Sequence, residues 1–255
     1  LIAGDEMWAW MPEFNLRRLH KLRLNPTANS SLLGGSITAA HIQLEKTANS
    51  KIDSTGWRAV VVVGAGEAGS GYFALDVTVP EAPELLWEIT PYRHCVGSAV
   101  SSTVASASCV ATKTFSGMGR STAAPVIGRA YFDKMSVPGE RAVAVIPGGK
   151  PWSASAEENT GQEGSGARTI YVLEMASGHV IRTFTASDMD TTGMSASSQD
   201  KAHQGHFWSQ PACYNTAPGQ LLSRCFIGDS KGHLWRLDLS DTNPQKWSLK
   251  WFHDA

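Results

Sequence analysis

The amino-acid sequence predicts an all-β fold, a partial β-propeller made of four-stranded antiparallel blades with one short inserted helix. Three observations support this prediction. A strand motif recurs along the chain, each clear copy is followed by a turn and a further strand, and helical periodicity is confined to one short segment. Because a single blade cannot bury both of its faces, repeats of this kind indicate blades that stack on one another.

The recurring motif is an alternating strand that carries an acidic residue near its end. Its three clear copies span residues 72–77, 170–175 and 234–239, and a fainter copy begins at Met7. Side chains alternate between the two faces of a strand, so the second residue of each copy should pack on the same side of its blade. These equivalent residues are the aromatic side chains Trp8, Phe73, Tyr171 and Trp235, which we assign to blade packing.

The copies also divide the chain. We expect residues 1–255 to form a single propeller fragment, with the tail of one blade at 1–12 and blades at about 34–90, 120–186 and 206–253. The N-terminal part of the parent protein is expected to be missing, since the sequence begins as though inside a folded domain.

A glycine-rich stretch before the first clear copy has the written form of a dinucleotide-binding fingerprint. Gly64, Gly66 and Gly69 follow four valines. That fingerprint requires a helix after the glycines, whereas the residues from Tyr72 to Val77 are aromatic and β-branched and are followed by prolines. The glycines are therefore predicted to join two strands in a hairpin, and nucleotide binding is rejected.

Charge and hydropathy exclude two further classes of function. The formal net charge is −1, which does not favour a nucleic-acid partner, and no apolar run is long enough to span a bilayer.

The short helix is predicted at 12–22, with Leu16, Leu19 and Leu22 along one stripe. Its basic residues are interpreted as a solvated face.

The four cysteines fall into two local pairs, Cys95 with Cys109 and Cys213 with Cys225. The segments around Cys213 and Cys225 would fold back as a hairpin that places the two sulfurs nearly opposite each other. An even number of cysteines with short loops between them favours two disulfides and an oxidising compartment. Four reduced, buried thiols are the alternative.

One polar loop has the pattern of a degenerate calcium site. Oxygen-bearing side chains would come from Asp188, Asp190, Thr192, Gln199 and Asp200. Gln199 stands where a bidentate glutamate would be expected, so a plain polar loop is the competing interpretation.

Three stretches of the chain resemble a known family. Residues 64–83, 227–240 and 4–12 are similar to the C-terminal propeller of the PilY/PilC-type tip adhesins of type IV pili. The resemblance implies an extracytoplasmic protein at the cell surface, the pilus tip or the outer membrane. It also implies a role in pilus assembly, in opposing retraction, in twitching motility and in adhesion. The implied partners are minor pilins or the pilus tip, and a host or abiotic surface.

The sequence departs from this family at one loop. Family members often carry an acidic calcium loop where this chain has the connection from Asn215 to Gln220, which contains no carboxylate. A hard cation needs charged oxygen ligands, so calcium is not expected there. We hypothesise that a disulfide between Cys213 and Cys225, which span this turn, replaces the ion.

Two other functions stay open at this stage. The residues Ala74 to Asp76 followed by Trp87 also resemble the repeat of quinoprotein (PQQ-dependent) dehydrogenase propellers, although the acidic base and calcium cluster of such enzymes are not visible. A non-enzymatic scaffold propeller of the outer membrane is the other alternative. We expect binding without catalysis and no bound cofactor, with the loops at 95–109 and 150–167 as the working surface.

Overall fold

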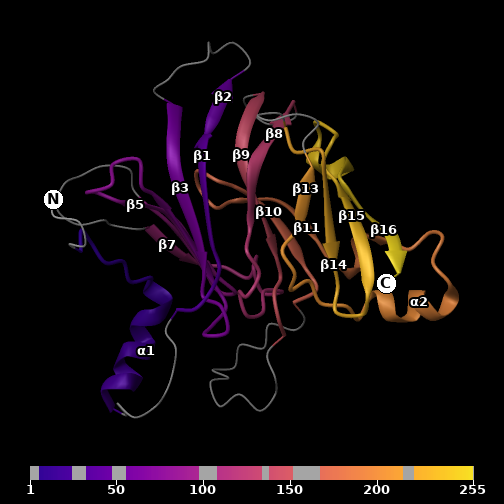
Figure 1. Cartoon of the computed structure of the whole chain (residues 1–255), viewed down its shortest axis with the longest axis horizontal. Helices are drawn as coiled ribbons and strands as arrows, with labels where there is room; N and C mark the ends of the chain where they lie inside the picture. The colour runs from indigo at the N-terminus through magenta and orange to yellow at the C-terminus, as the bar shows by residue number, and fades with distance from the viewer. Residues whose placement is uncertain are drawn as a thin grey trace.

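The computed structural model describes residues 6–24, 33–47, 56–97, 108–133, 138–151, 167–214 and 221–254. Strands dominate these residues and form three sheets that stand side by side, as Figure 1 shows. Each sheet contains a row of four antiparallel strands. The predicted all-β architecture is confirmed.

The first sheet has six strands in the order β1-β3-β4-β5-β6-β7. They are β1 (Ile37–Gln43), β3 (Trp57–Gly64), β4 (Tyr72–Asp76), β5 (Glu84–Thr90), β6 (Arg93–Val96) and β7 (Ser108–Ala111). β3 and β4 are antiparallel, so the predicted hairpin is confirmed and a strand follows the glycines. Gly66 lies in the left-handed region, where a Cβ atom would meet the backbone of Gly34 at 2.5 Å. This glycine therefore permits a close approach of two backbone segments.

The second sheet contains β2 (Glu45–Thr47), β8 (Val126–Phe132), β9 (Gly139–Pro147), β10 (Ile170–Glu174) and β11 (Val180–Phe184). β9 is the central strand and pairs with β8, β10 and β2. β2 continues almost directly from β1, and Leu44 stands between them. The chain thus passes from the edge of the first sheet into the second within one residue.

The third sheet has the order β12-β16-β15-β14-β13. Its strands are β12 (Met189–Asp190), β13 (Ala212–Tyr214), β14 (Arg224–Gly228), β15 (His233–Asp238) and β16 (Ser248–Asp254). Within the described residues, the helical elements are α1 (Glu13–Leu24), α2 (Ala196–Ala202) and two short 3-10 turns, η2 (Ala186–Asp188) and η3 (Pro244–Lys246). The predicted short helix is α1, whereas α2 was not anticipated. None of these described helices has the length and apolar character needed to cross a membrane.

Alternation along β9 explains how the three sheets stack. Ala142, Ala144 and Ile146 are buried against the first sheet, whereas Val143 and Val145 are buried against the third. Both faces of the middle sheet are therefore core, which accounts for the nearly continuous apolar run in this strand. Burial on both faces is the packing expected of an inner propeller blade.

The motif aromatics occupy equivalent places in the three sheets. Trp235 is packed between the third and second sheets, and Tyr171 between the second and first. Phe73 lies on the outer face of the first sheet, where Trp10 and Phe14 cover it. The shared direction of these three side chains follows from the period-two alternation of their strands.

Trp8 does not fit this pattern. Residues 6–12, expected to be the tail of a blade, form neither strand nor helix in the structure. Trp8 is 40% exposed, and its Nε1 donates a hydrogen bond to the Pro80 carbonyl at 2.7 Å. An alternating pattern alone does not make a strand, because a strand also needs a neighbour for its backbone groups.

An ion pair joins the second and third strands of each four-stranded unit. In every case an arginine near the start of the second strand faces the acidic residue at the end of the motif. The pairs are Arg58–Asp76 (3.3 Å), Arg141–Glu174 (3.7 Å) and Arg224–Asp238 (3.8 Å). The recurrence of the motif acid is thus explained by a local charge pair, which contributes about 1 kcal/mol or less at such partly exposed positions.

Candidate interaction site at the disulfide-closed edge of the first sheet

The first sheet extends beyond four strands through β6 and β7, and a disulfide closes this extension. Glu88 on β5 stands opposite Cys95, and Cys95 stands opposite Cys109 on β7. The two cysteines form a disulfide with an S–S distance of 2.10 Å. Because directly opposite residues share a face of the sheet, Glu88 and the disulfide form one row on the same side.

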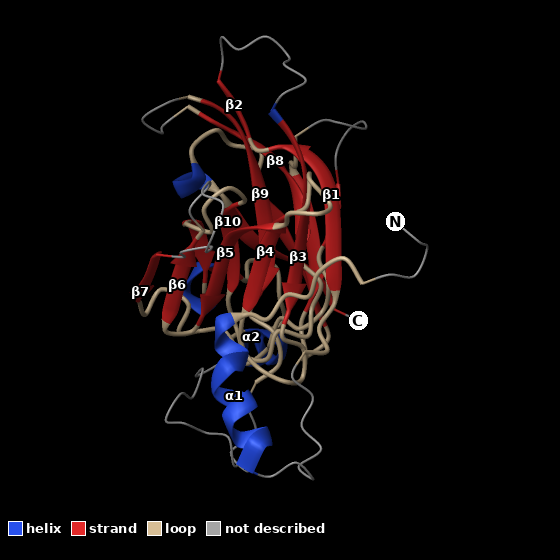
Figure 2. Ribbon diagram, turned by 90° about the vertical axis from the view of Figure 1, so that its left-hand side faces the viewer, coloured by secondary structure: helices blue, strands red, loops and turns tan. Residues whose placement is uncertain are grey.

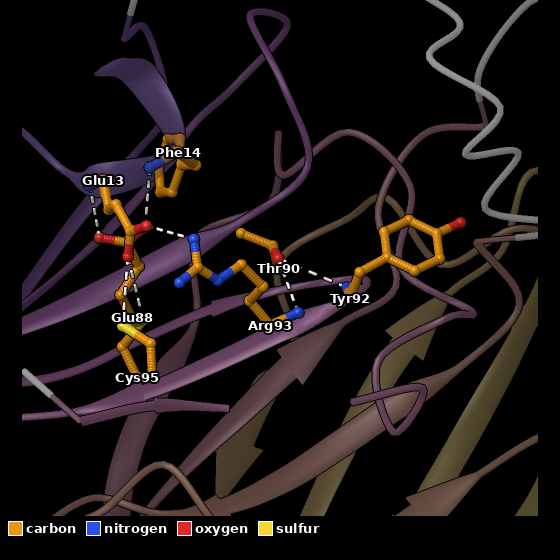
Figure 3. Close-up of polar contacts among 8 residues, drawn as sticks. Glu13, Phe14, Glu88, Thr90, Tyr92, Arg93 and Cys95 are labelled. Atoms are coloured by element: carbon orange, nitrogen blue, oxygen red, sulfur yellow. Dashed lines mark hydrogen bonds and ion pairs between the residues drawn. A yellow bond between two sulfur atoms is a disulfide. The ribbon is translucent and has the colours of Figure 1, made fainter. Parts of the chain in front are cut away.

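Helix α1 begins on this row. The Glu88 carboxylate accepts hydrogen bonds from the backbone N–H groups of Glu13 (2.8 Å) and Phe14 (2.9 Å), as Figure 3 shows. These are two of the N–H groups that a helix leaves without an internal partner. A carboxylate from a strand thus caps the helix, and its negative charge also favours the N-terminal end of the helix dipole.

Glu13 completes the contact between helix and sheet. Its carboxylate pairs with Arg93 of β6, and its Oε2 lies 3.2 Å from the Cys109 sulfur and 3.4 Å from the Cys95 sulfur. Disulfide sulfurs carry no proton, so the two sulfur approaches are packing contacts. The same three groups have the spacing of a metal site, but sulfurs bonded to each other are not thiolate ligands.

The Glu88 carboxyl is buried, and burial raises its pKa above the ordinary value of 4.5, against the opposing effect of the two N–H donors. The folded protein therefore takes up this proton at a higher pH than the unfolded chain does. We expect the contribution of Glu88 to the free energy of unfolding to increase as pH falls from the raised pKa to 4.5, and to be constant below that. Urea unfolding at a series of pH values, compared between the natural chain and Glu88→Gln, measures this contribution. A difference between the two proteins that is the same at every pH would contradict the expectation.

The second predicted cysteine pair also forms a disulfide. Cys213 on β13 stands directly opposite Cys225 on β14, and the S–S distance is 1.98 Å. The turn from Asn215 to Gln220 lies outside the described residues, so replacement of a calcium ion by this disulfide stays a hypothesis. Most of the two loops expected to form the working surface also falls outside the described residues, at 98–107 and 152–166.

Two of the candidate calcium ligands, Asp188 and Asp190, are used in protein contacts. Asp188 pairs with Arg182 at 2.9 Å and accepts hydrogen bonds from the backbone N–H and the hydroxyl of Thr185. Asp190 accepts the backbone N–H of Thr192 and lies 3.6 Å from the Lys250 ammonium group.

The other two candidates lie on a helix. Gln199 donates to the Met194 carbonyl at 3.2 Å, and Asp200 follows it on α2. The two aspartates are thus satisfied by neighbouring cationic and polar groups. These contacts favour the polar-loop interpretation, and calcium stays an untested prediction.

A buried aspartate organises the turn between β14 and β15. The Asp229 side chain is fully buried, and its Oδ2 lies 2.8 Å from His233 Nδ1 and accepts the Trp235 indole N–H at 2.8 Å. Its Oδ1 accepts the backbone N–H groups of Lys231 and His233. Four hydrogen bonds on one carboxylate fix the turn and the orientation of the buried Trp235 indole.

The sequence alone did not predict the roles of Glu13 and Glu88 at the start of α1, or of Asp229 in the turn before β15. Glu13 and Glu88 are 75 residues apart, and neither belongs to a recognisable motif. Asp229 lies inside the segment that was singled out for its resemblance, between glycines and before a tryptophan, and this spacing is the signal that could have identified it.

The stacked sheets define the class of the protein as a β-propeller. A search of solved structures finds the same fold in the crystal structure of the C-terminal domain of Pseudomonas aeruginosa PilY1. The TM-score is 0.57 at 17% sequence identity, and the match covers 97% of this chain and 40% of that chain. The predicted fold class, a partial β-propeller, is therefore confirmed.

The sequence comparisons point to the same family. Two curated proteins of Xylella fastidiosa (strain Temecula1), both described as type IV pilus biogenesis factor PilY1 homologs, are 23% identical over 250 residues and 24% identical over 240 residues. The matches cover 96% and 94% of this chain, which spans 14% of the length of each relative. No family model matches the chain. The predicted resemblance to PilY-type proteins is confirmed over nearly the whole chain.

Proposed function

We propose that this propeller acts in type IV pilus biogenesis, as part of a tip-associated protein that supports pilus assembly, opposes retraction and mediates adhesion to surfaces. The observation that carries the proposal is the similarity to two PilY1 homologs over 94–96% of the chain. The proposed partners are minor pilins or other components of the pilus tip, and a host or abiotic surface.

The two disulfides support an extracytoplasmic location. Both join residues that stand directly opposite on neighbouring strands, and each closes a loop at the end of a strand pair. Disulfides of this kind persist in oxidising compartments. We therefore place the protein at the cell surface, at the pilus tip or on the outer membrane.

We further propose that the chain works by binding and not by catalysis. The buried carboxylates at the two sites described above have structural partners, since Glu88 caps α1 and Asp229 fixes the turn before β15. Rigid strands that hold loops at their ends form the usual scaffold for recognition. The disulfide-closed edge of the first sheet is the proposed centre of this recognition.

Deletion of residues 1–255 from the parent gene tests the proposal. We expect loss of sheared surface pili, because an assembly factor is required before pili can accumulate. The same gene carrying Lys246→Ala, a change at an exposed ion pair, serves as the control and should restore normal pili. Normal pilus yield in the deletion strain would contradict the assembly role.

A second measurement separates binding from redox catalysis. The purified chain is expected to show no bound chromophore in the visible spectrum. A quinone-type absorption band that persists through purification would contradict the non-catalytic proposal and would favour an oxidoreductase.

A further inference from the structure

A histidine of the first sheet points toward the second sheet. His94 on β6 stands directly opposite Ile89 of β5 and Val110 of β7, and Figure 2 shows these three strands side by side at one edge of the sheet. Ile89 is fully buried between the first and second sheets. Because directly opposite residues share a face, His94 lies on this inner face, away from the row of Glu88 and the disulfide.

The turn between β10 and β11 receives this side chain. His94 Nε2 lies 2.8 Å from the Ser177 carbonyl oxygen, and the His94 ring meets the His179 ring edge-on, with 4.9 Å between the ring centroids. Gly178, which separates these two residues, packs so closely on Trp87 that a Cβ atom there would lie 2.7 Å from the indole. His94 and Trp87 therefore hold the same turn of the second sheet against the first.

The contact with Ser177 fixes the proton on His94. A carbonyl oxygen only accepts hydrogen bonds, so Nε2 is the donor, and Nδ1 carries no proton while the ring is neutral. Burial lowers the pKa of His94 below its ordinary value of 6.5, against the opposing effect of the hydrogen bond to Ser177, and a charge on His179 lowers it further. The folded state of this contact thus favours the neutral imidazole.

The described neighbours in the first sheet bring no carboxylate to this ring. Glu88 of β5 and Arg93 of β6 lie on the opposite face, where both contact α1. β7 has no charged side chain. In the loop after β7, the Phe115 ring lies edge-on to His94 at 6.0 Å, and Lys113 is exposed.

The second sheet brings one carboxylate to the turn, and this group is already paired. Glu174 accepts a hydrogen bond from the Ser177 hydroxyl and lies 3.7 Å from Arg141 Nε. Among the charges that the structure describes, that of His179 is the one that acts on His94. A second proton on His94 would therefore place a positive charge in a buried contact without a carboxylate to balance it.

We propose that His94 makes the contact between the first and second sheets sensitive to pH, because protonation of its imidazole in mildly acidic solution weakens the packing of the β10–β11 turn on the first sheet. An opened contact exposes the ring to water and binds the proton more readily than the closed contact does. Acidification below about pH 6.5 therefore shifts the equilibrium toward the opened form. This inference does not depend on the proposed role in pilus biogenesis.

Urea unfolding of the 255-residue chain between pH 8 and pH 5 tests the proposal. His94→Gln keeps a donor for the Ser177 carbonyl and does not titrate. As pH falls from 6.5 toward the lowered pKa of His94, the unfolding equilibrium constant of the natural chain should rise relative to this variant by up to about tenfold per pH unit, and above pH 6.5 the ratio should be constant. His253→Gln, at an exposed histidine on β16, is the matched control and should keep the pH dependence of the natural chain.

Hydrogen exchange locates the effect. The backbone N–H groups of Glu174 and Gly178 form the hydrogen bonds of the turn, to the carbonyls of His179 and Glu174. Between pH 7 and pH 5 their protection factors should fall in the natural chain by about tenfold more than those of β14 and β15 in the third sheet. In His94→Gln the turn should lose no more protection than the third sheet does.

Titration of the His94 ring, followed by NMR in the natural chain, keeps the test independent of whether the glutamine variant folds. The midpoint should lie below 6.5 and should rise when His179 is replaced by glutamine. Three results would overturn the proposal. They are a midpoint at or above 6.5, the same pH dependence of unfolding in the natural chain and in His94→Gln, and an equal loss of protection in the turn and in the third sheet.

Discussion

Replacing Asp229 by alanine is expected to lower the free energy of unfolding by about 3–5 kcal/mol. The substitution removes the acceptor for His233 Nδ1, for the Trp235 indole and for two backbone N–H groups in a turn where the carboxylate is fully buried. The buried His233 ring and Trp235 indole would then lack a partner, which is costlier than the loss of an exposed hydrogen bond. The third sheet should be the first part of the molecule to be affected.

Urea unfolding followed by tryptophan fluorescence measures this effect. Asp229→Asn, which keeps the size and two lone pairs of the side chain, should fall between the natural protein and the alanine variant. Asp190→Ala is the control at an exposed aspartate, with an expected change of about 1 kcal/mol or less. An Asp229→Ala protein as stable as this control would show that the turn forms without the carboxylate.

Replacing Trp87 by alanine is expected to cost a similar amount, about 3–5 kcal/mol, for a different reason. Trp87 is fully buried between the first and second sheets, and its Nε1 donates to the Met175 carbonyl at 2.8 Å. Gly178 of the second sheet packs so closely on the indole that a Cβ atom there would lie 2.7 Å from it. Loss of the ring would therefore leave a cavity at the contact between the two sheets.

Two further variants divide the Trp87 effect into its parts. Trp87→Phe keeps much of the volume but loses the hydrogen bond, and should cost less than the alanine variant. Trp208→Ala removes an exposed indole and should change the free energy of unfolding by about 0.5 kcal/mol or less. If Trp87→Ala were as mild as Trp208→Ala, the packing of the two sheets would not depend on this side chain.

The parts of the fold that were predicted from sequence are those governed by local rules. The hairpin of β3 and β4 follows from the glycines and the alternation after Tyr72, and the repeated motif follows from packing that recurs from sheet to sheet. The pairing of Cys213 with Cys225 is local in the same sense, because the two paired cysteines are only 12 residues apart in sequence. In each case the signal and the structure it specifies lie within a few residues of each other.

The features that were missed depend on contacts between distant segments. Glu88 caps α1 only because the first turn of the helix lies against the first sheet at that strand, and nothing near Glu88 in sequence indicates this. β6 and β7 flank a serine-rich stretch that was expected to be a loop, and they become strands because β6 pairs with β5 and β7 pairs with β6. Trp8 shows the opposite error, since a strand-like pattern without a neighbouring strand was assigned to a blade.

The direct connection of β1 to β2 affects how the protein unfolds under a mechanical load. β1 pairs with β3 in the first sheet, β2 pairs with β9 in the second, and the Leu44 carbonyl between them accepts the backbone N–H of Ala142. One continuous segment therefore contributes a strand to each of two neighbouring sheets. Separating either sheet under a mechanical load would require breaking the backbone hydrogen bonds that hold this segment in the other sheet. The two sheets are therefore expected to unfold together under load and not one after the other.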